Sequence, residues 1–85
     1  MYFHIGKDTI ISLKEVIMIL NLEKILEKNK FNDIIKELKM ENKIIDISEE
    51  NLKSLIILKR NDKLIGYISN ISSNTLGRRI NKNIY

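Results

Sequence analysis

The 85-residue chain contains no cysteine and no proline. Without cysteine it has no disulfide and no thiolate metal ligand, which is typical of the reducing cytoplasm, so we predict a cytoplasmic location. No apolar run approaches the roughly 20 residues that a membrane-spanning helix requires, and we expect no membrane span. The length fits one small domain, residues 1–85, which buries only a modest share of its surface.

Residues suited to catalysis are also scarce. The single histidine, His4, lies in a β-rich run with no second ligand at metal-binding spacing. The chain has no Gly-rich phosphate loop, no nucleophile elbow and no paired carboxylates at strand ends. We therefore interpret His4 as a hydrogen-bonded sheet residue and predict no catalytic residue, metal, cofactor or small-molecule substrate. An enzyme would require a site assembled between subunits.

The first twenty residues contain two β-rich runs, Tyr2–Ile5 and Thr9–Leu13, separated by Gly6-Lys7-Asp8. Glycine adopts positive φ at little cost, so a tight reversal is predicted between them. The second run continues past Lys14 and Glu15 into Val16–Leu20, which is apolar at every position. A strand of that kind must be covered on both faces. We expect the remaining segments to cover this strand and to pair with it.

Two amphipathic segments follow. Leu22, Ile25 and Leu26 predict one or two helical turns. A main helix from about Asn32 to about Glu41 is predicted by apolar residues at i, i+3, i+4 and i+7, namely Phe31, Ile34, Ile35 and Leu38. The two sets are half a turn out of phase, so we place a break at Asn29-Lys30.

Three further strands are predicted after residue 43. Ile44–Ile47 is the first, and Lys53–Arg60 and Lys63–Ser69 form a hairpin closed by Asn61-Asp62. A short C-terminal helix is then predicted from Leu76, Ile80 and Ile84, one turn apart, with Ser72 or Ser73 as its cap. Gly77 inside this helix weakens it by about 1 kcal/mol relative to alanine.

These elements predict an α+β fold: a mostly antiparallel sheet of four to five strands, one main helix and a short C-terminal helix. Leu55–Leu58 is again apolar on both faces. One main helix is too few to cover both faces of such a sheet. We therefore expect part of the second face to be buried against another copy of the chain, in a homo-oligomer.

The net charge of +4 is distributed unevenly. Residues 1–50 contain eight Lys against ten Asp or Glu, whereas residues 51–85 contain seven Lys or Arg against Asp62 alone. A basic half favours a polyanionic partner such as nucleic acid or an acidic membrane face. Solubility is the alternative interpretation of the same charge.

Five basic residues are candidate DNA-binding residues: Lys14, Lys53, Arg78, Arg79 and Lys82. Phosphate contacts require cations on a rigid frame, and arginine adds a forked set of donors. Each residue also has a structural interpretation. Cations near a helix C-terminus favour its dipole, and lysines at strand ends oppose edge-to-edge aggregation.

Several stretches resemble the extracellular matrix regulatory protein family (RemA/RemB), most closely its shorter RemB branch. They are Met1–Gly6, Ile10–Ser12, Lys14–Ile17, Lys53–Ile57 and Tyr67–Leu76. The resemblance implies a small α+β subunit with a LytTR-like fold that assembles into rings. It also implies a DNA-binding regulator of biofilm matrix genes.

The arginines that face DNA in this family transfer poorly to the present chain. One falls at Glu15, beside Lys14, and a pair falls at about Glu50-Asn51, with the basic residue after it at Lys53. Arg78 and Arg79 are the candidate substitutes. The resemblance therefore implies the ring more directly than the DNA contact.

Our leading hypothesis is a non-enzymatic, ring-forming transcriptional regulator that binds double-stranded DNA through phosphate contacts. The alternative is a protein–protein interaction or assembly module of the same fold that does not bind nucleic acid. A module on an anionic membrane surface is a weaker third hypothesis, because the C-terminal helix has only three aliphatic anchors and a glycine.

Overall fold

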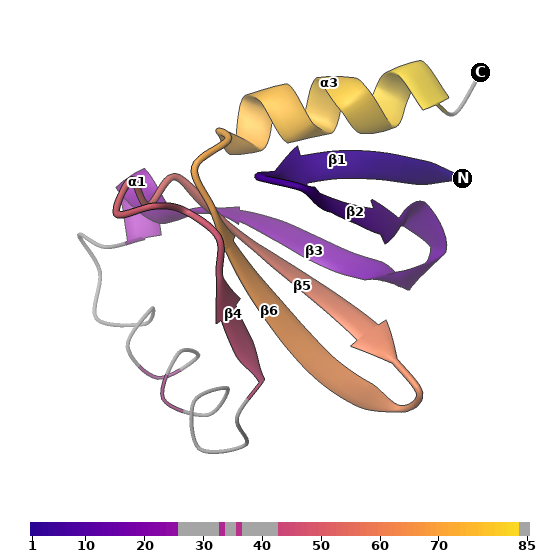
Figure 1. Cartoon of the computed structure of the whole chain (residues 1–85), viewed down its shortest axis with the longest axis horizontal. Coiled ribbons are helices and arrows are strands. Elements are labelled where there is room, and N and C mark those ends of the chain that lie inside the picture. The colour runs from indigo at the N-terminus through magenta and orange to yellow at the C-terminus, as the bar shows by residue number, and fades with distance from the viewer. Residues whose placement is uncertain (26–32, 34–35, 37–42, 84–85) are drawn as a thin grey trace.

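The computed structural model describes residues 1–25, 33, 36 and 43–83 (Figure 1). The elements in chain order are β1 (Tyr2–Gly6), β2 (Thr9–Ser12), the 3₁₀ turn η1 (Leu13–Glu15), β3 (Val16–Asn21), α1 (Leu22–Ile25), β4 (Ile44–Asp46), β5 (Ser54–Arg60), β6 (Lys63–Ser69) and α3 (Ser73–Asn83). The α+β class is confirmed. The expectation of a single sheet is wrong, because the strands form a two-stranded sheet, β1-β2, and a four-stranded sheet in the order β3-β5-β6-β4.

The division into two sheets occurs at η1. The polar pair Lys14-Glu15 interrupts the apolar run, and the chain turns there instead of continuing as one long strand. The backbone N–H of Leu13 still donates to the carbonyl of Met1 at 2.9 Å, but from Val16 onward the chain pairs with β5. The predicted continuous second strand is therefore two strands, β2 and β3, in different sheets.

The first hairpin has the predicted reversal. Gly6 has φ of 137° and Lys7 has φ of 46°, both in the region that glycine tolerates best. Phe3 pairs with Ile11 and His4 with Ile10. Because side chains alternate along a strand, Phe3, Ile5 and Ile11 point inward and are buried, whereas Tyr2, His4 and Ile10 point outward and are exposed.

The second hairpin is confirmed with its turn at Asn61-Asp62. Both residues have positive φ, 52° and 63°, as a two-residue type I′ turn requires. Strand β5 lies between β3 and β6, and all residues from Ser54 to Leu58 are buried. This burial agrees with its apolar pattern on both faces.

Strand β3 is not covered on both faces as its apolar sequence predicts. It lies at the edge of the four-stranded sheet, where Ile17 is 49% and Met18 is 44% exposed. Within one chain, the apolar run Val16–Leu20 is therefore not covered on both faces. The other edge strand, β4, runs parallel to β6, with Ile44 opposite Gly66.

The main core lies between the four-stranded sheet and a layer formed by the β1–β2 hairpin and α3 (Figure 1). Ile5, Ile56, Leu58 and Leu76 are fully buried in it. Complete burial of one such side chain contributes about 1.5–3 kcal/mol. A second, smaller cluster occupies the opposite face of the sheet and contains Leu22, Leu55, Ile57 and Ile68.

The C-terminal helix α3 is confirmed and continues through Gly77. Ser72 caps it, because its hydroxyl oxygen accepts the backbone N–H of Thr75 at 3.2 Å. Leu76 and Ile80 pack on the main core, as their spacing predicts. Ile84 lies outside the described residues, as does most of the predicted main helix from Asn32 to Glu41, with its break at Asn29-Lys30. No helix in the described part of the chain is long and apolar enough to cross a membrane.

Buried serines attach the segment before α3 to both sheets. The hydroxyl of Ser69 donates to the carbonyl of Ile5 and accepts the backbone N–H of Ile71 at 2.9 Å. The hydroxyl of Ser54 donates to the carbonyl of Ile71 at 2.7 Å. These bonds satisfy polar groups away from water and fix the direction in which α3 leaves the sheet.

Acid should loosen the junction between the sheets, because Glu15 of η1 is ion-paired with Arg60 of β5. The hydrogen bond and the positive charge of Arg60 hold the pKa of Glu15 below its ordinary value. Because the pKa of Glu15 is lower in the folded state than in the unfolded state, its ionised carboxylate stabilises the fold at pH values above the unfolded-state pKa of about 4.3. That stabilisation is lost as the pH falls through the folded-state pKa. In urea titrations, Glu15→Gln should therefore lose less stability than the wild type between neutral pH and acid. Glu23→Gln, an exposed carboxylate outside the ion pair, is the control, and equal acid slopes for both variants would contradict the prediction.

The two glycines should respond to alanine in opposite directions. A Cβ at Gly6 would lie 3.3 Å from Ser69 Oγ on a backbone with φ of 137°, so Gly6→Ala should destabilise the fold by about 1–3 kcal/mol. A Cβ at Gly77 meets nothing within 4 Å, so Gly77→Ala should stabilise α3 by about 1 kcal/mol. Denaturant melts at one fixed protein concentration measure both changes. Shifts in the same direction would refute this account of the two positions.

Candidate nucleic-acid interface

The candidate DNA-binding residues lie at three places in the fold. Lys14 is exposed in η1, Lys53 is half-buried just before β5, and Arg78, Arg79 and Lys82 belong to α3. The side chain of Lys82 lies outside the described part of the structure. The sequence clusters three of these cations because they share one helix, and Arg78 and Arg79 are adjacent in that helix.

Lys14 and Lys53 are not brought together. Strands β3 and β5 are antiparallel, with Val16 opposite Leu58 and Asn21 opposite Ser54. Lys14 precedes the first of these pairs and Lys53 adjoins the second. Five residue steps along a strand span roughly 17 Å, so the two lysines lie at opposite ends of the strand pair. A single chain does not assemble all the candidate residues into one patch.

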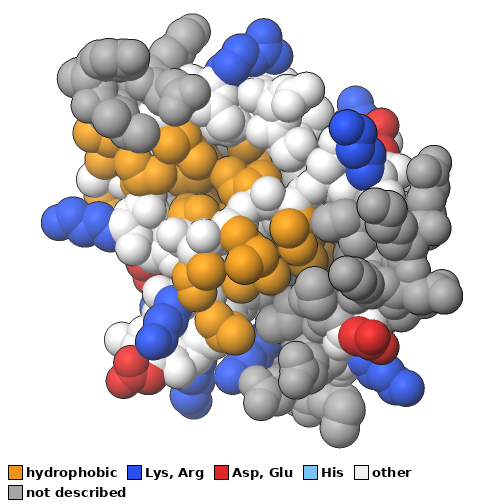
Figure 2. All heavy atoms as spheres, turned by 180° about the vertical axis from the view of Figure 1, so that it is seen from behind, with side chains coloured by type: hydrophobic (Ala, Val, Ile, Leu, Met, Phe, Trp, Pro, Cys, Tyr) orange, Lys and Arg blue, Asp and Glu red, His pale blue; other side chains and the backbone are white. Residues whose placement is uncertain are grey.

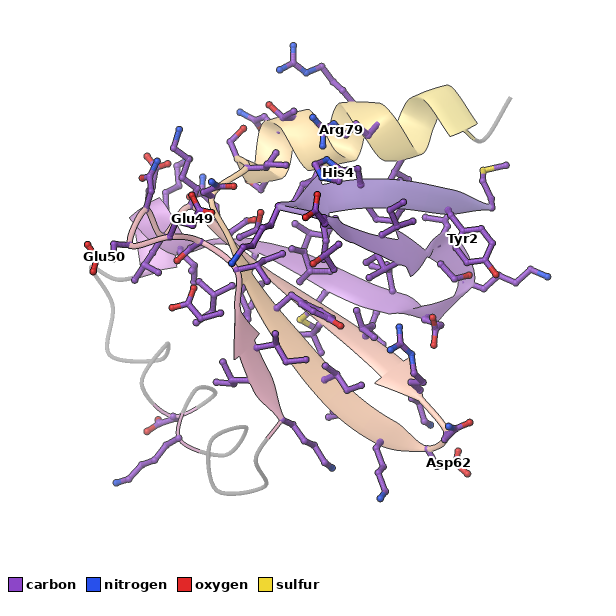
Figure 3. The ribbon with its side chains drawn as sticks, viewed as in Figure 1. Tyr2, His4, Glu49, Glu50, Asp62 and Arg79 are labelled. Carbon is purple, nitrogen blue, oxygen red and sulfur yellow. The ribbon has the colours of Figure 1, made fainter. Side chains whose placement is uncertain are left out.

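Arg78 and Arg79 have different surroundings although they are neighbours in α3. Arg79 Nη1 donates to the carbonyl oxygen of His4 at 2.8 Å and lies 3.4 Å from His4 Nδ1. Figure 3 shows Arg79 reaching from α3 to His4 on β1. Arg78 is exposed, and its one hydrogen bond to a described residue is to Thr75 Oγ1 within its own helix, at 3.2 Å. Arg79 therefore attaches α3 to β1, and Arg78 is the arginine that faces solvent.

The contacts of His4 identify its tautomer. Its Nε2 is hydrogen-bonded to the carbonyl oxygen of Lys7, which accepts only, so Nε2 carries the proton. The opposite nitrogen, Nδ1, then accepts from Arg79. The prediction that His4 is a hydrogen-bonded sheet residue is confirmed, and its ring is fixed between the first turn and α3. No group of three or more His, Cys, Asp or Glu that could hold a metal ion occurs among the described residues.

Among ion pairs that join two described residues, the structure has one, between Arg60 and Glu15. Arg60 Nε lies 2.7 Å from Glu15 Oε2 and Arg60 Nη2 lies 3.2 Å from Oε1, so the contact is bidentate. The same contact raises the pKa of Arg60. Arg60 thus has a structural role. Lys14, Lys53, Arg78 and Arg79 form no ion pair with any described carboxylate.

Sequence reasoning missed Lys7 and Tyr2 as surface residues near these cations. Lys7 is exposed in the β1–β2 turn, where its carbonyl receives the His4 contact, and Tyr2 is 71% exposed on β1 (Figure 3). The signal was the period of two along β1, which places Tyr2 and His4 on one face. Without the structure, nothing indicated that this face would be left uncovered.

Large apolar side chains remain exposed in several elements. They are Met1, Tyr2, Ile10, Ile17, Met18, Ile45, Leu52 and Leu64. Figure 2 shows hydrophobic side chains gathered over one face of the molecule, with lysine and arginine side chains placed around its margin. Exposed apolar surface of this kind is typical of an interaction site.

Comparison with known proteins identifies the family. No curated protein matches the chain. The family model described as RemA-like, extracellular matrix regulatory protein A-like, matches residues 2–80. That range contains β1 through most of α3, and with it every candidate cation except Lys82. Because the match covers nearly the whole sequence, the chain belongs to the RemA-like family of extracellular matrix regulatory proteins.

Proposed function

We propose that this chain is a non-enzymatic transcriptional regulator of extracellular matrix genes, closest to RemB within its family. In this proposal the subunit has a LytTR-like fold and forms a homo-oligomeric ring that binds double-stranded DNA through its phosphates. Membership of the RemA-like family supports the regulatory role. The observation that carries the DNA contact is the set of cations, Lys14, Lys53, Arg78 and Arg79, that no described carboxylate neutralises.

Phosphate contact suits these residues better than base readout. Arg78 projects from a helix that is anchored on the core by Leu76 and Ile80, so its cation stands on a rigid frame. Such contacts set register on a duplex but do not discriminate between bases. Binding with little sequence preference and a strong dependence on salt is the expected behaviour.

An oligomer would cover the apolar edge strand and bring the separated cations of several subunits together. Ile17 and Met18 leave apolar surface at the edge strand β3, and an edge strand also presents unpaired backbone N–H and C=O groups. Neighbouring subunits that cover this edge would repeat Lys14, Lys53 and Arg78 at regular intervals. Repetition would then give these separated cations one continuous surface for a duplex.

Removal of Arg78 tests the DNA contact directly. Each phosphate contact releases about 0.9 counterion, so Arg78→Ala should weaken binding to all duplex sequences alike and reduce the log–log salt slope by about 1. Because Arg78 is exposed, its removal should leave stability unchanged. Fluorescence anisotropy on two unrelated duplexes, over a series of salt concentrations, measures both quantities.

Lys63→Ala, an exposed cation at the tip of the β5–β6 hairpin, is the matched control and should retain the wild-type slope. Loss of binding to only one of the two duplexes would show that Arg78 reads bases. Wild-type binding that does not change with salt would refute phosphate contact altogether.

Substitution of Met18 tests the oligomer. Met18→Lys places a charge on the exposed edge of β3 and should reduce the mass measured by light scattering at micromolar concentration, because a buried unpaired charge opposes assembly. Ile45→Lys, a comparably exposed residue on the opposite edge strand β4, shows which edge is used. A wild-type protein that is strictly monomeric would refute the ring.

An assembly module without nucleic-acid binding is the second candidate function. It is favoured by Glu15 and Glu50, which stand where the family resemblance places DNA-facing arginines, and by the pairing of Glu15 with Arg60. Purified protein that is free of nucleic acid, binds no duplex at low salt and retains a protein partner in pull-down would support this function over the first.

A further inference from the structure

The outer face of the β1–β2 hairpin carries ring and apolar side chains that are exposed to solvent. Tyr2 is 71% and Ile10 is 62% exposed, and His4 is exposed between them. Tyr2 and His4 are two residues apart on one strand, so they share a face and lie about 6.6 Å apart along it. Ile10 is the cross-strand partner of His4.

Cations surround this face. Lys7 lies in the turn at one end of the hairpin and Lys14 lies just beyond β2 at the other. Arg79 reaches the face from α3 through its contacts with His4 (Figure 3). Asp8 is the one carboxylate in residues 1–14, and the next, Glu15, is neutralised by Arg60. The charge around this face therefore attracts a polyanion and repels a basic surface.

The imidazole ring of His4 is held in one orientation, which favours stacking of a planar ligand on it. Both ring nitrogens are engaged, one by the carbonyl of Lys7 and the other by Arg79, so the orientation of the imidazole is set before any ligand arrives. Arg79 adds a planar guanidinium beside that ring. A ligand with exposed aromatic faces and phosphates would contact both kinds of group.

We propose that this surface, defined by Tyr2, His4, Lys7, Lys14 and Arg79, binds single-stranded nucleic acid. Tyr2 and His4 stack on unpaired bases while the surrounding cations contact phosphates. A duplex is the wrong ligand for the rings, because its base faces are hidden within the stack, whereas every unpaired base offers a face to an aromatic side chain. The two proposed contacts share Lys14 and Arg79, but only the single-strand contact uses the rings of Tyr2 and His4, so substitution of Tyr2 separates them.

Tyrosine fluorescence tests the stacking step. The chain has no tryptophan and three tyrosines, so emission reports on tyrosine directly. Titration with oligo(dT), and with oligo(U) of equal length, should quench the wild-type emission, and the two arms decide between DNA and RNA. Tyr2→Phe retains the ring and should keep the affinity while losing the Tyr2 part of the quenching.

Tyr2→Ala should weaken single-strand binding by about tenfold or more, as expected for loss of one base–ring stack, and leave duplex affinity unchanged. Leu64→Ala removes another exposed apolar side chain, on β6, and should leave single-strand affinity at the wild-type value. The anisotropy of labelled oligo(dT), oligo(U) and a blunt duplex of the same length provides the three affinities.

Three results would overturn the proposal. They are the absence of single-strand binding at low salt, single-strand affinity that Tyr2→Ala leaves intact, and quenching in Tyr2→Phe that is as large as in the wild type. A change in oligomer mass in Tyr2→Ala would also overturn it, because Tyr2 would then belong to a subunit interface. Duplex binding by the same wild-type sample separates failure of this proposal from failure of the proposed function.

Discussion

Burial of β5 is the constraint on which the rest of the structure depends. A strand whose residues from Ser54 to Leu58 are all buried requires a hydrogen-bonded neighbour on each edge and a cover on each face. Strands β3 and β6 supply the edges, and the first hairpin together with α3 supplies one cover. To provide that cover, the N-terminal segment must leave the large sheet, and the turn at Leu13–Glu15 is where it does so. The bidentate contact between Glu15 and Arg60 then ties this turn to the far end of β5.

The position of the basic residues follows from the same packing. Helix α3 lies against β1 because Leu76 and Ile80 complete the main core, and the serine bonds before it fix its direction. Successive residues of a helix point about 100° apart. With Leu76 and Ile80 facing inward, Arg79 is turned toward β1 and Arg78 toward solvent. The different roles of two adjacent arginines therefore result from core packing alone.

Two of the surfaces left uncovered in the described part of the chain differ in character. The edge at Ile17 and Met18 is apolar and belongs to an unpaired strand, which suits association with protein. The outer face of the first hairpin combines Tyr2 and His4 with surrounding cations, which suits a polyanion with accessible bases. One small domain thus presents chemically distinct surfaces, and each can be altered without disturbing the core.

The sequence by itself determined the local elements of this protein. Pairs of β-rich runs on either side of turn residues predicted both hairpins, with Asn61-Asp62 as the turn of the second. The spacing of Leu76 and Ile80 predicted α3. Both kinds of signal are local, because turn chemistry and hydrophobic period act between near neighbours in the chain. Only the tertiary structure decided which strands share a sheet, that Arg60 is occupied by Glu15, and that Lys14 and Lys53 lie at opposite ends of one strand pair. Those outcomes depend on contacts between residues far apart in sequence, such as Arg79 with His4, and a local pattern carries no record of which distant group will be adjacent.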